Sequence, residues 1–159
     1  MNFSNRIVAV LALLLVMSSF QVQGAAPTFA QFPSHGHAGS TPIPLRFVSK
    51  QDSEFRTELT AAATMPTNFA GNYVLTTIGC GASCVLVAAI DKKTGRVIWL
   101  PYTLCCWKLE ITEPVHFQAN SDLLILNGQR NERGAVGPHY VRLTRGRFIA
   151  LPSHTPAMR

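Results

Sequence analysis

The chain has 159 residues, with 14 lysine and arginine residues against 8 acidic residues and a formal net charge of +6. A chain of this length forms one domain around one core, because domains usually contain about 100 to 200 residues. Length and composition therefore exclude a multidomain enzyme, a repeat solenoid and a transmembrane transporter.

The first 24 residues have the pattern of a secretory signal peptide. Arg6 supplies the positive charge, the apolar run 7–17 follows it, and small residues up to Gly24 suit a cleavage site. The apolar run is too short for a stable anchor, because a membrane-spanning helix needs about 20 residues. We therefore expect export, cleavage after Gly24 and no stable membrane insertion. The remaining 135 residues carry a net charge of +5, which favours acidic partners or surfaces.

Residues 25–46 predict a flexible lead-in to the domain. They contain four prolines, two glycines and several serines and threonines. This mixture sustains neither a helix nor a paired strand. The single globular domain is then expected to span residues 47–159.

The stretch 52–64 predicts one amphipathic helix. Its apolar residues recur at helical spacing from Phe55 onwards. Asp52 or Ser53 can cap the start of this helix, and Pro66 prevents its continuation.

The rest of the chain predicts strands. Short runs rich in Val, Ile, Leu and Tyr alternate with Gly, Asn, Asp and Pro, which is typical of strands joined by turns. The expected strands are 73–78, 85–90, 96–100, 115–118, 123–126, 140–144 and 147–151, with a short extended piece at 110–111. We expect hairpins of 85–90 with 96–100 and of 140–144 with 147–151. The predicted fold class is α+β, mainly an antiparallel β meander of about seven strands with one N-terminal helix.

Four cysteines occur, as Cys80 and Cys84 in one segment and the adjacent Cys105 and Cys106 in another. In a small exported domain, an even number of cysteines indicates disulfide bonds. The favoured pairing joins the two segments, because adjacent side chains of an extended strand point to opposite faces. The alternative is local, with a bond between Cys80 and Cys84 and a strained bond between the adjacent pair.

Zinc binding and cysteine catalysis are the chemical alternatives for these four residues. Adjacent ligands and a CxxxC spacing do not match the usual zinc motif. A catalytic cysteine needs a base such as His116 or His139, and the spacing selects no cysteine for that role. We therefore expect no metal, no cofactor and no catalytic residues.

The stretch 127–139 is the main candidate binding segment. It is longer than a tight turn requires, and such loops often hold binding groups. Its candidate binding residues are Arg130, Asn131, Glu132, Arg133 and His139. Guanidinium groups there can bind carboxylates or phosphates through paired hydrogen bonds. Arg142, Arg145 and Arg147 extend the charge into the last hairpin, which predicts one basic end of the molecule.

Aromatic residues gather between positions 99 and 107. Among them, Tyr102 and Trp107 are candidates for an exposed binding rim. Burial in the core is favoured for the aromatic residues of this stretch, because aromatic side chains bury large areas, and the exposed rim is the alternative that would make these two residues binding groups. The basic stretch has no interleaved aromatic residues for base stacking, so we expect no nucleic-acid partner.

Four short motifs carry a resemblance to known proteins. They are NFAGNY (68–73), GCGASC (79–84), DKKTGRV (91–97) and GQRNE (128–132). The chain resembles, over about residues 45–151, a group of small exported proteins of Gram-negative bacteria, most of which have no assigned function. The GCGxSC element is the most specific part of this resemblance. In size, export and lack of a catalytic set, the group is similar to periplasmic immunity proteins and periplasmic lysozyme inhibitors, which implies a periplasmic location.

The sequence thus predicts a periplasmic, non-enzymatic binding protein. We expect an immunity or inhibitor protein that occludes a cell-wall-targeting enzyme, with a peptidoglycan-acting enzyme as the protein partner. The segments 79–84, 101–107 and 127–139 are expected to face that partner. The alternatives are an envelope-associated structural module that binds anionic polymers and a small enzyme with cysteine or histidine chemistry. The sequence does not indicate an oligomeric state.

Overall fold

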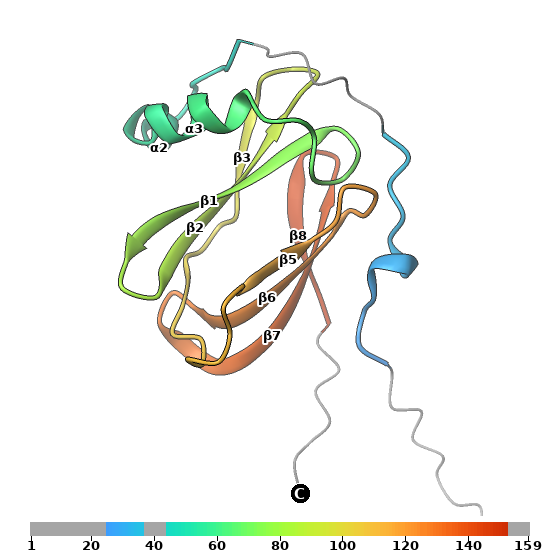
Figure 1. The fold of residues 1–159 in the computed structure, drawn as a ribbon, viewed down its shortest axis with the longest axis vertical. Helices are drawn as coiled ribbons and strands as arrows, with labels where there is room; N and C mark the ends of the chain where they lie inside the picture. Colours follow the sequence, from blue (N-terminus) through green and yellow to red (C-terminus); the bar gives the residue numbers. More distant parts are fainter. Residues whose placement is uncertain (1–24, 37–43, 153–159) are drawn as a thin grey trace, which may run out of the picture. The chain divides into compact units, whose positions relative to one another are not determined.

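Figure 1 shows the chain as a computed structural model, in which residues 25–36 and 44–152 are described. The expected signal peptide at 1–24 lies outside the described residues. One compact unit spans Ala26–Ser153. Its main element is an eight-stranded antiparallel sheet, accompanied by two short α-helices. The predicted α+β class with a mainly antiparallel sheet is confirmed.

The strands are β1 (Tyr73–Gly81), β2 (Cys84–Asp91), β3 (Val97–Trp99), β4 (Leu104–Cys105), β5 (Val115–Phe117), β6 (Leu123–Arg130), β7 (Arg133–Thr144) and β8 (Arg147–Leu151). Their order in the sheet is β1-β2-β4-β6-β7-β8, with β3 beside β2 and β5 beside β6. Both expected hairpins are present, as β2–β3 and β7–β8. The expected extended piece at 110–111 is wrong, because the backbone turns there and the N–H of Ile111 donates to the carbonyl of Lys108 at 2.9 Å.

Strand β2 is buried on both faces, which explains its unbroken apolar sequence. Val87 and Ala89 pack into a core shared with Leu124 of β6 and with β7. Ala88 and Ile90 pack on the opposite face, against the helices. A strand buried on both faces shows a continuous apolar run instead of an alternating pattern. The β1–β2 part of the sheet therefore lies between the helices and the β5–β8 part (Figure 1).

Two helices, α2 (Lys50–Glu54) and α3 (Arg56–Ala63), replace the single expected helix. Ser49 caps the first of them, so the predicted cap at Asp52 or Ser53 is wrong. The reason is a capping box, in which the N–H of Asp52 donates to Ser49 Oγ at 3.0 Å and the N–H of Ser49 donates to Asp52 Oδ2 at 2.9 Å. No helix within residues 25–36 and 44–152 is long and apolar enough to cross a membrane.

The Asp52 carboxylate joins the helices to the sheet. It is 1% exposed, and its Oδ1 accepts a hydrogen bond from Trp99 Nε1 of β3 at 2.8 Å. Its Oδ2 accepts from the backbone N–H groups of Val48 at 2.8 Å and Ser49 at 2.9 Å. Burial by itself raises the pKa of Asp52, but the hydrogen bonds from Trp99, Ser49 and Val48 outweigh burial and hold the pKa below its ordinary value. Asp52 is therefore an ionised, fully hydrogen-bonded link.

Lys92 forms hydrogen bonds with the C-terminal end of the helical segment. This side chain follows β2 and is 4% exposed. Its Nζ donates to the carbonyl of Ala63 at 2.6 Å and to that of Met65 at 3.3 Å. A cation at a helix C-terminus satisfies the last carbonyls and suits the helix dipole. Trp99 of β3 and Lys92 of the β2–β3 turn thus hold the two ends of the helical segment.

Part of the segment expected to be a lead-in belongs to the compact unit. The short 3₁₀ helix η1 (Phe29–Gln31) lies in this part. Ser121, which is 1% exposed, places its Oγ 3.2 Å from the carbonyl of Phe29 and 2.8 Å from that of Phe32. The described residues of 25–46 therefore contact the loop before β6, and the flexibility of the segment stays a prediction.

Candidate functional site

The three segments expected to face a partner lie side by side. Cys84 of β2 pairs with Cys105 of β4, and Cys105 pairs with Gln129 of β6. The N–H of Cys106 also donates to the carbonyl of Ser83 at 3.1 Å. The β1–β2 turn, β4 and the end of β6 therefore form neighbouring rows of one surface, which we call the hairpin surface (Figure 1).

The stretch 127–139 is not the long loop that the sequence predicted. It forms the end of β6 and the start of β7, joined by the two-residue turn Asn131-Glu132. Both turn residues have positive φ, 51° and 58°, as a type I′ hairpin turn requires. The start of β7, from Arg133 to Val136, is exposed. Because that part faces no core, its sequence lacks the apolar alternation that indicates a strand.

Asn131 fixes the tip of this hairpin to the chain before β4. Its Oδ1 accepts from the backbone N–H of Thr103 at 2.9 Å, and its own N–H donates to the carbonyl of Thr103 at 3.0 Å. These two bonds continue the β4–β6 pairing, in which Leu104 is opposite Arg130. The Asn131 amide oxygen therefore positions the tip. Glu132 is exposed at the turn itself.

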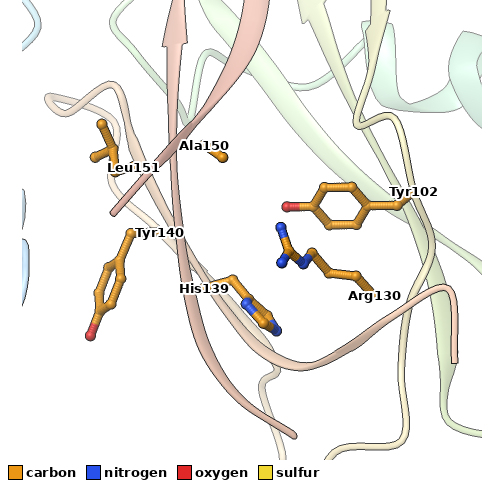
Figure 2. A pocket seen from close by; sticks show the side chains of 6 residues that line it. All are labelled: Tyr102, Arg130, His139, Tyr140, Ala150 and Leu151. Carbon is orange, nitrogen blue, oxygen red and sulfur yellow. The ribbon is translucent and has the colours of Figure 1, made fainter. Parts of the chain in front are cut away.

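Figure 2 shows a small pocket beside the end of β6, lined mainly by β7 and β8. Its lining residues are Tyr102, Arg130, His139, Tyr140, Ala150 and Leu151. Its volume is about 60 Å³. One water needs about 10–15 Å³ of such space, so the pocket has room for a few waters or a carboxylate group. The pocket brings together three of the candidate binding residues, Tyr102, Arg130 and His139.

The Tyr102 hydroxyl is a buried donor without a partner in the described part of the chain. The Arg130 guanidinium lies beside it, with Cζ 5.5 Å from the centre of the Tyr102 ring (Figure 2). A guanidinium only donates, so it cannot accept the hydroxyl hydrogen. Burial raises the pKa of Tyr102, and the positive charge and the N–H donors of Arg130 lower it only in part. The hydroxyl therefore stays protonated at neutral pH. An oxygen atom of a ligand would supply the acceptor that this hydroxyl lacks.

His139 is half-buried and neutral. Its Nε2 lies 3.0 Å from the carbonyl oxygen of Gly128. A carbonyl oxygen only accepts, so Nε2 carries the hydrogen and Nδ1 of the neutral ring is an acceptor. Burial lowers the pKa of His139, and although the Gly128 carbonyl raises it, the Arg130 charge lowers it again. The charge in the pocket at pH 7 is therefore that of Arg130.

This combination of groups suits an anionic oxygen ligand. Arg130 offers a planar fork of donors, which matches a carboxylate or a phosphate. The Tyr102 hydroxyl offers one more donor. Residues 25–36 and 44–152 contain no cluster of three or more His, Cys, Asp or Glu residues that could hold a metal ion.

The other candidate residues lie outside the pocket. Trp107 is partly buried and packs against the core. Arg133 and Glu132 are exposed at the hairpin tip. Sequence reasoning missed Tyr140 and Leu151, although the predicted β7–β8 hairpin places these two residues opposite each other.

The predicted single basic end is wrong. Arg133 begins β7, whereas Arg145 follows its last residue. A strand rises by about 3.3 Å per residue, so these two residues lie roughly 35–40 Å apart. Arg142 is already paired, because its Nη2 lies 3.0 Å from Asp122 Oδ2. The positive charge is therefore divided between the two ends of β7.

The favoured cysteine pairing between the two segments is also wrong. Cys80 and Cys84 form a disulfide across the β1–β2 turn, with an S–S distance of 1.98 Å. The two-residue turn brings these strands together at this point, because Gly81 is opposite Cys84. Cys105 and Cys106 are free thiols, the first buried and the second exposed. The local alternative is confirmed for Cys80 and Cys84 only.

No family model, curated protein or solved structure matches this chain. The resemblance through the GCGxSC element stays a prediction. The fold and the pocket describe the chain as an antiparallel β domain with a small pocket near the two-residue β6–β7 turn.

Gly128→Ala is expected to lower the free energy of unfolding by about 2–3 kcal/mol, because overpacking of a close contact commonly costs about 1–3 kcal/mol. A Cβ atom at this position would lie 2.5 Å from the backbone oxygen of Cys105 and 3.1 Å from Leu104 Cδ1. Urea denaturation measures the change. Gly137→Ala is the matched control, because a Cβ there meets nothing within 4 Å. Equal losses in the two variants would contradict this packing argument.

Tyr102→Phe is expected to leave the free protein equally stable or about 1 kcal/mol more stable. The reason is that the variant removes a buried hydroxyl without a partner, and such a group is destabilising. Thermal unfolding of the two proteins measures the difference. A clear loss of stability would show that the hydroxyl has a structural partner.

Cys105→Ala is expected to speed the alkylation of Cys106 about tenfold at pH 8. The Cys106 thiol donates to Cys105 Sγ at 2.7 Å, and this bond is the main reason why the pKa of Cys106 rises from 9.0 to about 11. Without Cys105 the pKa falls toward 9.0, although burial and the Glu132 charge still raise it. The thiolate fraction then rises by up to about 100-fold, while the more acidic thiolate is up to roughly tenfold less nucleophilic. Iodoacetamide labelling with mass detection measures the rate, and an unchanged rate would contradict the assignment.

Proposed function

We propose that the protein is a periplasmic, non-enzymatic binding protein, an immunity or inhibitor protein that occludes a cell-wall-targeting enzyme. The observation that carries this proposal is the pocket next to the hairpin surface, where Arg130 at the end of β6 lies beside the unpartnered hydroxyl of Tyr102. In this proposal the pocket receives a carboxylate side chain of the partner enzyme. Such a contact has two favourable contributions. The Arg130 guanidinium forms a charge-assisted hydrogen bond with the carboxylate, and the carboxylate supplies an acceptor for the Tyr102 hydroxyl.

Rigidity of the hairpin surface supports the proposal. The Cys80–Cys84 disulfide closes the β1–β2 turn, and Asn131 holds the neighbouring hairpin tip. A surface that is already ordered loses little conformational entropy when it binds, which favours tight association. Inhibitors of enzymes commonly bind with little backbone movement.

The charge of the chain supports an acidic partner. Enzymes that cleave glycosidic bonds generally use a pair of carboxyl groups in their active site. The 135 residues expected after cleavage carry a net charge of +5, which attracts the protein to such an acidic cleft, and complementary charge raises the association rate. Leu109, in the loop after β4, is 97% exposed and offers an apolar contact for a partner.

Cysteine catalysis has less support. Cys80 and Cys84 are consumed by their disulfide. A pKa of about 11 leaves about one Cys106 thiol in 10⁴ ionised at pH 7, and the thiolate is the nucleophile. His139 already donates its Nε2 hydrogen to Gly128. A module that binds anionic polymers is the second candidate, because exposed arginines occur at both ends of β7.

The proposal is tested by affinity capture from a Gram-negative envelope extract at about 0.05 M and about 0.3 M salt. We expect one protein partner, retained in a 1:1 ratio at both salt concentrations. Retention of anionic polymers at low salt only, without a stoichiometric protein, would overturn the proposal in favour of the structural module.

A further inference from the structure

The sulfur atoms of Cys105 and Cys106 are closer than unbonded sulfur atoms normally pack. Their Sγ atoms are 2.7 Å apart. A disulfide bond is about 2.05 Å long, so the gap to a covalent bond is about 0.65 Å. In an extended strand, two adjacent side chains point to opposite faces and their sulfur atoms cannot meet. The backbone must therefore be turned at this pair.

Cys106 provides this turn, with a φ of 57° in the left-handed region. A residue other than glycine adopts this conformation only at an energetic cost, and such conformations persist when the surroundings enforce them. Here the N–H of Cys106 donates to the carbonyl of Ser83 at 3.1 Å, and Cys105 pairs with both Cys84 and Gln129. The neighbouring strands thus hold the two sulfur atoms together.

Metal binding fits the pair less well than a covalent bond. Two thiolates on one zinc ion, each at about 2.3 Å in a tetrahedral arrangement, lie about 3.8 Å apart. The observed 2.7 Å is nearer to a disulfide. The described residues also place no group of three metal-ligating side chains together.

We propose that Cys105 and Cys106 form a reversible vicinal disulfide, a two-electron redox site next to the hairpin that carries Arg130. The oxidant is a disulfide compound, RSSR. The thiolate of the exposed Cys106 attacks one sulfur atom of RSSR. The RS–SR bond breaks, a Cys106–SR mixed disulfide forms, and the released RS⁻ takes the proton of Cys106 and leaves as RSH. The buried Cys105 then attacks Cys106 Sγ, the Cys106–SR bond breaks as the Cys105–Cys106 bond forms, and the second RSH leaves with the proton of Cys105. Two electrons and two protons pass from the pair to the oxidant, and excess RSH reverses the reaction.

Glutathione redox titration of the isolated protein tests this inference. The sample is first reduced until mass spectrometry shows two free thiols at Cys105 and Cys106 and an intact Cys80–Cys84 bond. We expect both thiols to disappear together in one two-electron step, without a glutathione adduct. The peptide that contains Cys105 and Cys106 should then be lighter by two hydrogen atoms, and reduced glutathione should restore the thiols.

Two single variants are the matched controls. In Cys105→Ala, the exposed Cys106 should keep one glutathione as a stable mixed disulfide, because no second thiol resolves it. In Cys106→Ala, the Cys105 thiol, 2% exposed, should take up little glutathione. The wild-type result stands by itself if either variant folds poorly, which circular dichroism would show.

Two outcomes would overturn the inference. The first is a lasting glutathione adduct on Cys106 of the wild-type protein while Cys105 still reacts with an alkylating reagent. The second is a rearranged bond between Cys105 and Cys84, found by peptide mapping. The titration contains no partner protein, so its outcome is independent of the proposed function.

Discussion

Arg130→Glu is expected to weaken binding of the captured partner at least 100-fold. The substitution replaces the cation of the pocket by an anion, which repels the carboxylate that the pocket is proposed to receive. Loss of one member of a hydrogen-bonded charge pair at an interface commonly costs about 2–5 kcal/mol of binding free energy. Charge reversal also adds repulsion, so we expect a loss of at least about 2.7 kcal/mol, which corresponds to a 100-fold weaker Kd. Titration calorimetry with the purified partner measures this change.

Arg145→Glu is the matched control for this prediction. It changes the net charge of the chain by the same amount, but it lies at the other end of β7. We expect its affinity to stay within about threefold of the wild-type value, because exposed charges this far from the pocket are screened. Equal losses in the two variants would indicate general attraction to an acidic surface and would contradict a role for the pocket.

Asp52→Ala is expected to lower the free energy of unfolding at pH 7 by about 3 kcal/mol. The variant leaves the partly buried Trp99 Nε1 donor and the N–H groups of Val48 and Ser49 without their acceptor. Loss of a helix cap costs about 0.5–2 kcal/mol, and an unsatisfied buried donor costs about 1–3 kcal/mol. Urea denaturation measures the change. Glu54→Ala in the same helix is the control, because Glu54 is exposed and should change stability by less than about 0.5 kcal/mol.

The contribution of Asp52 should also depend on pH in a defined direction. Its pKa in the folded protein lies below the ordinary value of 3.8. The stabilisation is therefore fully present above pH 3.8 and is lost as the pH falls through the folded pKa. We expect the difference between wild type and Asp52→Ala to be constant from about pH 8 to pH 5 and to shrink below about pH 4. A difference that grows on acidification would contradict the lowered pKa.

Apolar periodicity predicted those strands that face a core. The hairpin of 140–144 with 147–151 is present as β7–β8, because Val141 and Leu143 alternate toward the core. Strand β4 has only two residues, which is too short to show an alternating apolar pattern. The start of β7 faces no core, so its sequence looks like a polar loop.

Residue chemistry predicted the members of the site better than their positions. Tyr102, Arg130 and His139 could be selected as binding groups, but their meeting depends on the β4–β6 pairing and on the register of β6 and β7. The bond between Asp52 and Trp99 joins residues 47 positions apart, and no local pattern indicates it.

The cysteine prediction failed for a local reason. It assumed that Cys105 and Cys106 point to opposite faces, as in a regular strand. The left-handed φ of Cys106 breaks this alternation, and the tight β1–β2 turn pairs Cys80 with Cys84 instead. Positive φ at a residue other than glycine follows from tertiary contacts, such as the bond from Cys106 to Ser83, and the sequence does not display it.

Occlusion of an enzyme is tested most directly by the activity of the captured partner. The purified partner is assayed on peptidoglycan while wild-type protein or Arg130→Glu is added in increasing amounts. We predict that activity falls to background at one equivalent of wild-type protein and stays near its full value with Arg130→Glu. Full activity of a partner that is saturated with wild-type protein would contradict the inhibitor function.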